Sequence, residues 1–338
     1  MPTAPAPAEP RRRMLLAGSS LAAALAACST PLPPLTPSTP TPRLEHRVRG
    51  SGQPLVVLQS GLGDGLSVWG DVQASLPTTL ASVAFSRPGY GGSARADGAR
   101  SPCDVAKLTR EFLRGARLPP PYLLVGHSLG GLYQVAFAQR YPDEVAGLVL
   151  LDPTHPAHWA TMQTETPALA AVVRAARVTA FSAPMRREFD DQALCNSELA
   201  AWRLPAVPVR LLVRERFTGL EAGAFERAVR RLEADWSQRL GGVEATRVAG
   251  AGHYLQRDRP RVVSEAISAV AALAVAAGTG APRQRARGDA RDAAGGDARD
   301  AARGDAPVGT GDDARGGTRA HNHRQAARAD GARGRAVT

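Results

Sequence analysis

The sequence YLLVGHSLGG, residues 122–131, contains the pattern Gly-x-Ser-x-Gly at Gly126, Ser128 and Gly130. Its first half is a short apolar run, and the residues after the serine continue into a predicted helix. A serine at such a sharp strand-to-helix turn has a strained backbone, and its neighbours two residues away press against each other. Only small side chains fit at those two positions, so glycine is expected at both. The pattern therefore predicts a serine hydroxyl raised above a sheet edge, with the Leu129 amide at the start of a helix, where negative charge is stabilised.

Apolar runs alternate with segments of helical periodicity on both sides of this turn, from residue 43 to residue 277. Strands are predicted at residues 44–49, 54–59, 81–85, 122–125, 145–151, 207–213 and 243–248. Helices are predicted at residues 68–76, 104–118, 130–140, 221–240 and 262–277. This alternation predicts an α/β fold with a mostly parallel sheet and helices on both faces. In such sheets, functional residues gather at the carboxyl ends of the strands.

Residues 154–205 interrupt the alternation. They contain helical patterns at residues 168–176 and 188–204 but no convincing strand pattern. Because a compact domain rarely contains a structureless loop of this length, the segment is predicted to be a helical insertion. We expect it to lie over the carboxyl edge of the sheet.

A base must take the proton of a serine hydroxyl as it attacks, and a carboxylate usually holds that base in one orientation. Among seven histidines, His253 is the candidate base because it follows a strand, lies in a glycine-rich loop and is C-terminal to every predicted strand. His127 is adjacent to Ser128, but neighbours on a strained turn point in different directions. Asp152, directly at a strand end, is favoured as the acid. Glu215, flanked by two arginines after a later strand, remains the alternative.

The oxyanion that forms on an attacked carbonyl needs at least two hydrogen-bond donors. The Leu129 amide is one predicted donor. The second is expected from SGLG at residues 60–63, where glycines directly after a buried strand allow backbone amides to turn inward. The amide of Leu62 is the candidate in this loop. The sequence has no His/Cys cluster with metal-ligand spacing, and serine chemistry needs neither a metal nor another cofactor.

The segment from about residue 44 to residue 277 resembles the α/β-hydrolase family. The motifs that carry the resemblance are GHSLGG at 126–131, QSGLG at 59–63, RPGYGGS at 87–93, and GHY at 252–254 ahead of DRP at 258–260. By this resemblance, Ser128 is the nucleophile, His253 is the base, and the amides of Leu62 and Leu129 stabilise the oxyanion. Residues 154–205 then correspond to the family's cap, which shapes substrate access. Members that attack alkyl halides or epoxides use an aspartate nucleophile, so Ser128 argues against those activities.

Two positions depart from the family pattern. The usual histidine-glycine before the oxyanion amide is Ser60-Gly61 here, which changes the hydrogen bonding of the loop but keeps the amide. The family's common aspartate after the strand that precedes the late helix has no counterpart near Arg214. Some members draw their acid from the earlier strand, which is consistent with Asp152.

Residues 1–28 have the pattern of an export signal, with three arginines, an apolar run too short to span a bilayer comfortably and small residues before Cys28. RRMLL at residues 12–16 resembles a twin-arginine signal, whose cargo is exported folded. LAAC at residues 25–28 resembles a bacterial lipobox, in which the cysteine is lipidated. These features predict an exported protein of the bacterial cell envelope, anchored to the membrane through lipid on Cys28. A plain cleaved signal, giving a periplasmic or secreted protein, and an uncleaved anchor are the alternatives.

Residues 29–42 consist mostly of Pro, Ser and Thr, a composition that predicts an extended tether. Residues 278–338 are rich in Ala, Gly, Arg and Asp and have almost no large apolar residues, which predicts a disordered tail. This tail and the N-terminal segment hold much of the net charge of +11. No arginine-rich face interleaved with aromatic residues occurs between them, so nucleic-acid binding is not expected.

Cys103 and Cys195 are the cysteines that remain if Cys28 is acylated. In an exported protein, two remaining cysteines suggest a disulfide bond. Two separate thiols are the alternative, because the sequence does not show whether the two Cα atoms come within bonding range.

Together these features predict an exported serine hydrolase that cleaves carboxylic esters, with a small-molecule or lipid ester as substrate. Ser128 would form an acyl-enzyme, which water activated by His253 would hydrolyse. An aminopeptidase or amidase on the same catalytic residues is one alternative, with Glu188, Asp190 or Asp191 as an anchor for an amine. A catalytically inactive α/β-hydrolase scaffold used for binding is another, although the presence of both Ser128 and His253 argues against it.

Overall fold

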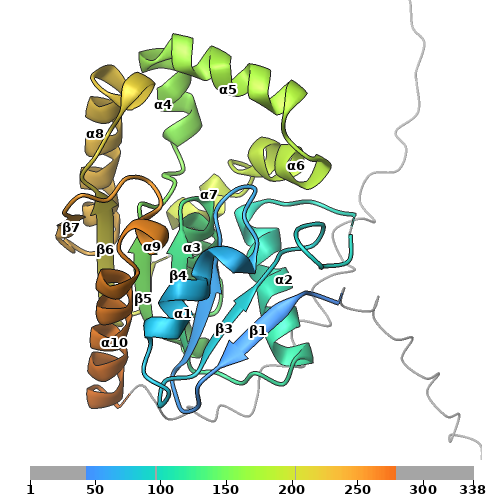
Figure 1. Ribbon diagram of the computed structural model, residues 1–338, viewed down its shortest axis with the longest axis vertical. Coiled ribbons are helices and arrows are strands. Elements are labelled where there is room, and N and C mark those ends of the chain that lie inside the picture. Colours follow the sequence, from blue (N-terminus) through green and yellow to red (C-terminus); the bar gives the residue numbers. More distant parts are fainter. Residues whose placement is uncertain (1–42, 96, 202, 279–338) are drawn as a thin grey trace, which may run out of the picture. The chain divides into compact units, whose positions relative to one another are not determined.

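The computed structural model describes residues 43–95, 97–201 and 203–278 (Figure 1). The predicted export signal with Cys28, the tether at residues 29–42 and the tail from residue 279 onward lie outside the described residues. Within the described part, no helix combines the length and the apolar character needed to cross a membrane.

A seven-stranded sheet forms the centre of the described part, with the strand order β1-β3-β2-β4-β5-β6-β7. Its strands are β1 (His46–Arg49), β2 (Leu55–Gln59), β3 (Ser82–Phe85), β4 (Tyr122–His127), β5 (Val145–Leu151), β6 (Val209–Arg214) and β7 (Ala245–Val248). β1 runs antiparallel to β3 at one edge, and all other neighbouring strands are parallel. The predicted, mostly parallel α/β sheet is therefore confirmed.

Helices cover both faces of this sheet, which explains why β2, β4 and β5 are buried along their whole length and mostly apolar. The helices on one face are α2 (Pro102–Gly115), α3 (Leu129–Arg140) and α8 (Ala224–Arg239). Those on the other are α1 (Gly70–Ser75), α9 (Leu255–Asp258) and α10 (Pro260–Ala276). Short 3-10 helices lie at η1 (Leu66–Trp69), η2 (Pro142–Glu144) and η3 (Gly219–Glu221). Phe112 and Trp236 anchor the first layer, and Val72 and Ile267 the second.

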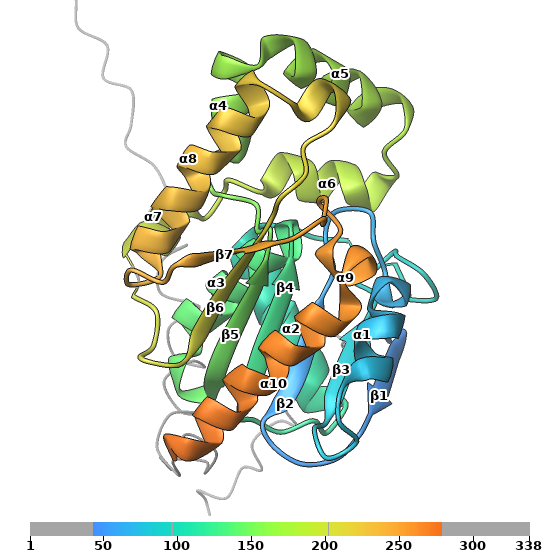
Figure 2. The same ribbon diagram turned by 60° about the vertical axis from the view of Figure 1, so that its left-hand side comes forward.

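Residues 154–205 contain four helices, α4 (His158–Glu165), α5 (Pro167–Thr179), α6 (Ala183–Asp191) and α7 (Asn196–Ala201). α4, α5 and α6 lie over the carboxyl edge of the sheet, where the insertion was expected (Figure 1 and Figure 2). The single helix expected at residues 188–204 is wrong, because the chain turns between α6 and α7. The turn includes Cys195, whose side chain is disulfide-bonded to Cys103 in α2.

Cys103 and Cys195 form a disulfide bond, with their Cα atoms 6.1 Å apart. The bond joins the first turn of α2 to the segment between α6 and α7, across 92 residues of sequence. A hydrogen bond supports the same junction, since the Arg100 amide donates to Asp191 Oδ2 at 2.8 Å. Of the two alternatives that the sequence left open, the structure has the paired cysteines.

Candidate active site

Ser128 occupies the turn between the end of β4 and the start of α3. Its backbone has φ 54° and ψ −125°, which a non-glycine residue rarely adopts. A side chain on Gly126 would collide with the backbone of Gly130, and one on Gly130 would collide with the carbonyl oxygen of Ser60. The steric reason for glycine at both positions is therefore confirmed, and the turn fixes the serine hydroxyl at the carboxyl edge of the sheet.

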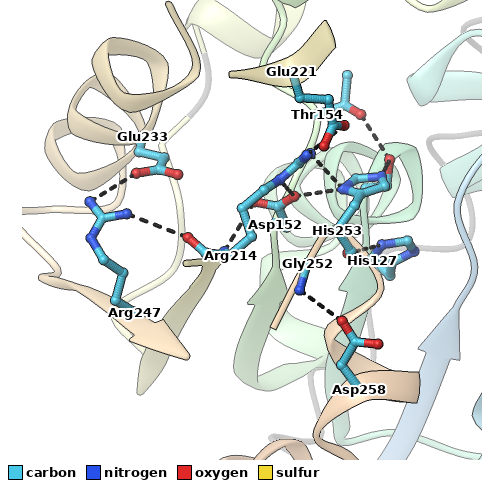
Figure 3. A network of polar contacts seen from close by, with 11 residues as sticks. His127, Asp152, Thr154, Arg214, Glu221, Glu233, Arg247, Gly252, His253 and Asp258 are labelled. Atoms are coloured by element: carbon cyan, nitrogen blue, oxygen red, sulfur yellow. Dashed lines mark hydrogen bonds and ion pairs between the residues drawn. The ribbon is translucent and has the colours of Figure 1, made fainter. Parts of the chain in front are cut away.

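His253 lies in the loop between β7 and α9 and contacts both of its predicted partners. Its Nε2 atom is 3.1 Å from Ser128 Oγ. Its Nδ1 atom is 2.5 Å from Asp152 Oδ2, and these two residues are labelled in Figure 3. Asp152 directly follows β5 and is buried. An ionised carboxylate accepts the Nδ1 proton, which leaves Nε2 able to accept the hydroxyl proton of Ser128. The structure thus brings together the three residues selected from chain order and strand ends.

Arg214, the last residue of β6, was not among the predicted site residues. Its Nε donates to Asp152 Oδ2 at 2.6 Å, its Nη1 donates to Glu221 Oε1 at 2.9 Å, and its Nη2 lies 2.8 Å from His253 Nδ1 (Figure 3). Burial opposes ionisation of Asp152, but the hydrogen bond from His253 and the charge of Arg214 outweigh it and hold the pKa of Asp152 well below its usual range. Asp152 is therefore an anion at neutral pH. The sequence did contain a signal for Arg214, namely a charged residue at the end of a buried strand. Because β5 and β6 are parallel neighbours, their last residues meet at the same edge of the sheet, where Asp152 lies.

Glu215, the alternative acid, serves another part of the loop. Its Oε2 accepts a hydrogen bond from the Gly250 amide at 2.7 Å. Among the described residues, Asp152 is the carboxylate that reaches His253, and Glu215 does not. A different carboxylate steadies the histidine loop, since Asp258 Oδ2 accepts a hydrogen bond from the Gly252 amide at 2.7 Å (Figure 3).

His127 holds the backbone of His253. Its Nε2 donates to the carbonyl oxygen of His253 at 2.8 Å, and the two ring centroids are 4.7 Å apart (Figure 3). Burial, together with the nearby His253, lowers the pKa of His127 to about 3, so the ring is neutral and carries its proton on Nε2. Sequence reasoning set this residue aside as a base and missed its role as a support. The two residues are 126 positions apart, and no local pattern encodes such a contact.

Leu62 and Leu129, the predicted oxyanion residues, line the same cavity as Ser128 and His253. Within the described part of the chain, neither of the two amides donates to another backbone group. Gly61 packs against Ser128, because a Cβ at this position would lie 3.1 Å from Ser128 Cβ. The two loops that carry the amides therefore meet at the serine.

The loop at residues 60–65 is held by Ser60, which stands where the family usually has histidine. The Ser60 hydroxyl donates to the carbonyl oxygen of Gly65 at 2.9 Å and accepts from the indole N–H of Trp69 at 2.9 Å. Ser60 and Trp69 are buried, and Gly65 is partly exposed. The altered hydrogen bonding expected at this position thus consists of a serine that bridges the loop and a core tryptophan.

The cavity at Ser128 has two lobes. The α8 lobe, of about 260 Å³, is lined by apolar residues that include Leu169, Phe225, Val229 and Trp236. The α6 lobe, of about 240 Å³, is lined by Leu62, Trp159, Phe189 and Tyr254. The residues shared by both lobes are Ser128, Thr154, His158, Met162, Val173 and His253. A largely apolar space therefore extends to two sides of the serine.

Two polar residues that sequence reasoning did not select, Thr154 and His158, lie where the lobes meet. Thr154 Oγ1 is 3.3 Å from Ser128 Oγ, and the Thr154 amide donates to the Ser128 carbonyl oxygen at 2.9 Å. Burial and the neighbouring His253 lower the pKa of His158 to about 4, so its ring is neutral at pH 7. The junction of the lobes therefore has hydrogen-bonding groups without an added positive charge.

The described sheet and helices, with Ser128, His253 and Asp152 at the carboxyl edge, can be compared with known families. A family model described as the alpha/beta hydrolase fold matches residues 54–189, which include Ser128 and Asp152. The match and the architecture of the sheet show that the chain has the α/β-hydrolase fold, as the resemblance suggested.

Curated proteins that are similar to this chain match only part of it. The protein YqjL of Bacillus subtilis is 29% identical over 109 residues, which are 32% of this chain and 43% of that protein. The (lyso)-N-acylphosphatidylethanolamine lipase of Bos taurus is 34% identical over 118 residues, which are 34% of this chain and 33% of that protein. The chain thus spans less than half the length of these relatives.

A solved esterase from Thermogutta terrifontis has a similar fold. It is 18% identical to this chain and covers 73% of it, against 97% of the esterase chain, with a TM-score of 0.50. At this level of identity, the likeness shows the fold alone.

Proposed function

We propose that the protein is a serine hydrolase that cleaves carboxylic esters through an acyl-enzyme on Ser128. The observation that carries this proposal is the chain of contacts from Ser128 Oγ to His253 Nε2, at 3.1 Å, and from His253 Nδ1 to Asp152 Oδ2, at 2.5 Å. A hydroxyl becomes an effective nucleophile when a base of fixed orientation takes its proton as it attacks. This geometry provides such a base.

The first half of the reaction forms the acyl-enzyme. Ser128 Oγ attacks the ester carbonyl carbon while His253 Nε2 accepts its proton, and the negative charge moves to the carbonyl oxygen. The amides of Leu62 and Leu129 donate to that oxygen, and each such donor contributes about 3 kcal/mol to stabilising the transition state. The carbon–oxygen bond to the alcohol then breaks, and the leaving oxygen takes the proton from His253.

The second half releases the acid. Water enters on the side that the alcohol has left, and His253 Nε2 takes a proton as the water oxygen attacks the acyl carbon. The bond to Ser128 Oγ breaks, and the proton returns to the serine. Asp152 remains ionised throughout and stabilises the imidazolium that forms in each half.

The two-lobed cavity supports an ester with an apolar group on each side of the carbonyl. Each lobe has a volume of about 240–260 Å³, at or below the lower end of the range for small-molecule sites. Aromatic side chains line both lobes, Phe225 and Trp236 in one and Trp159 and Phe189 in the other. A compact, uncharged ester suits this lining better than a large polar substrate.

The amidase alternative has no support from the acidic residues that suggested it. Glu188 is fully buried and paired with Arg87, and Asp190 is paired with Arg177 at the surface. Asp191 accepts a hydrogen bond from the backbone amide of Arg100, just before α2. Among the residues that line the two lobes, none of these three acids occurs.

A fluorophosphonate probe tests the proposal and separates an enzyme from a binding scaffold. We expect the probe to label the wild-type protein and the control Ser75→Ala, which changes an exposed serine of α1, but not Ser128→Ala. Turnover of a p-nitrophenyl ester should follow the same pattern. An unlabelled wild-type protein, or equal labelling of Ser128→Ala, would overturn the proposal.

We also propose that the protein is exported and lipid-anchored through Cys28, which rests on the motif LAAC at residues 25–28. Metabolic labelling with a fatty-acid precursor in a bacterial host tests this. The wild-type protein should incorporate label and fractionate with membranes, and Cys28→Ser should do neither. Continued labelling of Cys28→Ser would contradict the anchor.

A further inference from the structure

Arg87 is a buried cation that holds the loop of the predicted oxyanion donor. It lies in the loop after β3, and 1% of it is exposed. Its Nη1 donates to the carbonyl oxygen of Ser60 at 2.6 Å, and its Nη2 donates to the carbonyl oxygen of Gly61 at 2.8 Å. These two peptide groups lead directly into Leu62. The guanidinium therefore fixes the plane of the peptide that carries the Leu62 amide.

Glu188, in α6 of the insertion, holds the other side of the same guanidinium. Its Oε1 accepts from Arg87 Nε at 2.8 Å, and its Oε2 accepts from Arg87 Nη2 at 2.8 Å. Tyr90 Oη donates to Oε2 at 2.8 Å, and Arg100 Nη1 lies 3.7 Å from Oε1. Glu188 has no exposed surface. A two-point contact between rigid groups sets orientation as well as distance, which a single hydrogen bond would not do.

Aromatic rings close the space around this ion pair. The Arg87 guanidinium carbon lies 5.0 Å from the ring centroid of Tyr90 and 5.3 Å from that of Tyr133, and both rings are buried. Burial opposes the charge on Arg87, but the charge of Glu188 outweighs it and raises the pKa of Arg87. Burial and Glu188 also raise the pKa of Tyr90, which keeps its hydroxyl as a donor. The arrangement therefore persists across the neutral pH range.

The residue after Glu188 reaches the substrate cavity. Phe189 lines the α6 lobe together with Leu62, so the two ends of the Arg87–Glu188 contact both belong to the same lobe. Arg87 binds the oxyanion loop, and Glu188 belongs to helix α6, which lines the lobe. Because the contact between Arg87 and Glu188 is buried and rigid, the position of the loop depends on the position of α6.

We propose that Arg87 is a positioning residue that orients the Leu62 N–H toward the developing oxyanion. Through Glu188, the orientation of this amide depends on the position of helix α6 in the insertion. The inference rests on the proposed function, in that Leu62 has an oxyanion to bind. A positioning role predicts a loss in kcat, because the amide acts on the transition state, whereas the lobe that binds the ground state keeps its lining.

The test compares Glu188→Gln and Tyr90→Phe with Asp190→Asn, which removes a charge from the exposed side of the same helix. We expect kcat for a p-nitrophenyl ester to fall about 10- to 100-fold in Glu188→Gln and about threefold in Tyr90→Phe, with KM changed by less than about twofold. The inhibition constant of a trifluoromethyl ketone, whose serine adduct carries an oxyanion, should rise by the same factor as kcat/KM falls. Asp190→Asn should match the wild-type protein in both.

Tyr90→Phe keeps the test decisive if Glu188→Gln does not fold, because it removes one hydroxyl and leaves the ion pair. Hydrogen exchange at the Leu62 amide gives a readout that needs no turnover. It should be faster in Glu188→Gln and Tyr90→Phe than in Asp190→Asn. Unchanged exchange and unchanged kcat in folded variants, or a rise in KM alone, would overturn the positioning role. A wild-type protein without labelling or turnover would instead refute the proposed function, and the exchange rates would still decide the coupling to α6.

Discussion

Asp152 and Arg214 place opposite charges around one nitrogen of His253. Nδ1 can donate to Asp152 Oδ2, at 2.5 Å, or accept from Arg214 Nη2, at 2.8 Å, but it cannot do both. Because Asp152 is ionised and Arg214 already donates to it through Nε, the proton on Nδ1 is the favoured tautomer. That tautomer presents an unprotonated Nε2 to Ser128, which the proposed reaction requires.

Replacing Asp152 with asparagine should therefore reverse the tautomer. The amide NH2 group can donate to Nδ1, which would move the proton to Nε2, and Arg214 would lose its buried ion pair. We expect Asp152→Asn to lower kcat by about 10⁴-fold, as the loss of a catalytic carboxylate does in serine hydrolases. Glu215→Gln, which removes the alternative acid, should change kcat by less than about threefold. Ester assays of the two variants measure this, and the opposite ranking would show that the acid has been misassigned.

His127 makes the folded state sensitive to acid. Its pKa of about 3 in the folded protein lies below the ordinary value of 6.5, so the unfolded chain binds more protons between these pH values. The stability from neutral His127 is therefore complete above pH 6.5 and is lost as the pH falls. One pKa unit corresponds to about 1.4 kcal/mol, so His127 should remove roughly 2–3 kcal/mol of unfolding free energy between pH 6.5 and 4.5.

The matched comparison is between the wild-type protein and His127→Asn, in urea titrations at several pH values. The variant should be less stable at pH 7, because it loses the contact with the His253 carbonyl, but it should lose less stability on acidification. His158 and the carboxylates titrate in both proteins and cancel in the difference. Parallel pH profiles would mean that His127 is not the group responsible.

Local sterics and chain order were enough to select Ser128, His253 and Asp152. The strained turn leaves a short-range pattern, and the ends of parallel strands must meet at one edge. The contacts of Arg214 and His127 depend on partners that are 62 and 126 residues away. Such contacts follow from the register of the sheet and the path of a loop, and neither is written in a local sequence pattern.

At the scale of elements, the strands were predicted more accurately than the helices of the insertion. Buried strands appear as continuous apolar runs, and β2, β4 and β5 are buried on both faces. α4 was missed because a short helix that walls a cavity buries little surface, and only Met162 of its residues is buried. The break between α6 and α7 was missed because a disulfide bond, rather than a helix-breaking residue, accompanies it.

The disulfide bond between Cys103 and Cys195 should contribute strongly to stability. It closes a loop of 92 residues, for which the loss of unfolded-chain entropy corresponds to about 4–5 kcal/mol, although measured values are commonly 2–4 kcal/mol. Urea unfolding should show a loss of about 2–5 kcal/mol in the double variant Cys103→Ser/Cys195→Ser. A reductant should lower the stability of the wild-type protein to that of the variant and leave the variant unchanged. Equal stability of the two oxidised proteins would contradict this contribution.

The whole molecule places the proposed chemistry between a rigid sheet edge and a helical wall. The sheet supplies Ser128 and Asp152, the loop before α9 supplies His253, and helices α4 to α6 and α8 supply most of the lobes. The chemical step is therefore set by the sheet, while the size and shape of the substrate are set by the helices. A change in the wall should alter specificity without removing the reaction.

The volume of the lobes should limit the length of the ester. We expect kcat/KM for p-nitrophenyl butyrate or octanoate to exceed that for the palmitate by at least about tenfold, because a long chain cannot be buried in a lobe of about 260 Å³.

Phe225→Ala should enlarge the α8 lobe and shift the optimum toward longer chains. Leu220→Ala, which changes an exposed residue of η3, should keep the wild-type profile. The series also assigns the lobes, since a shift with acyl length indicates that the α8 lobe holds the acyl group, and a shift with alcohol length alone indicates that it holds the alcohol. A palmitate rate equal to the butyrate rate would show that the lobes do not enclose the chain.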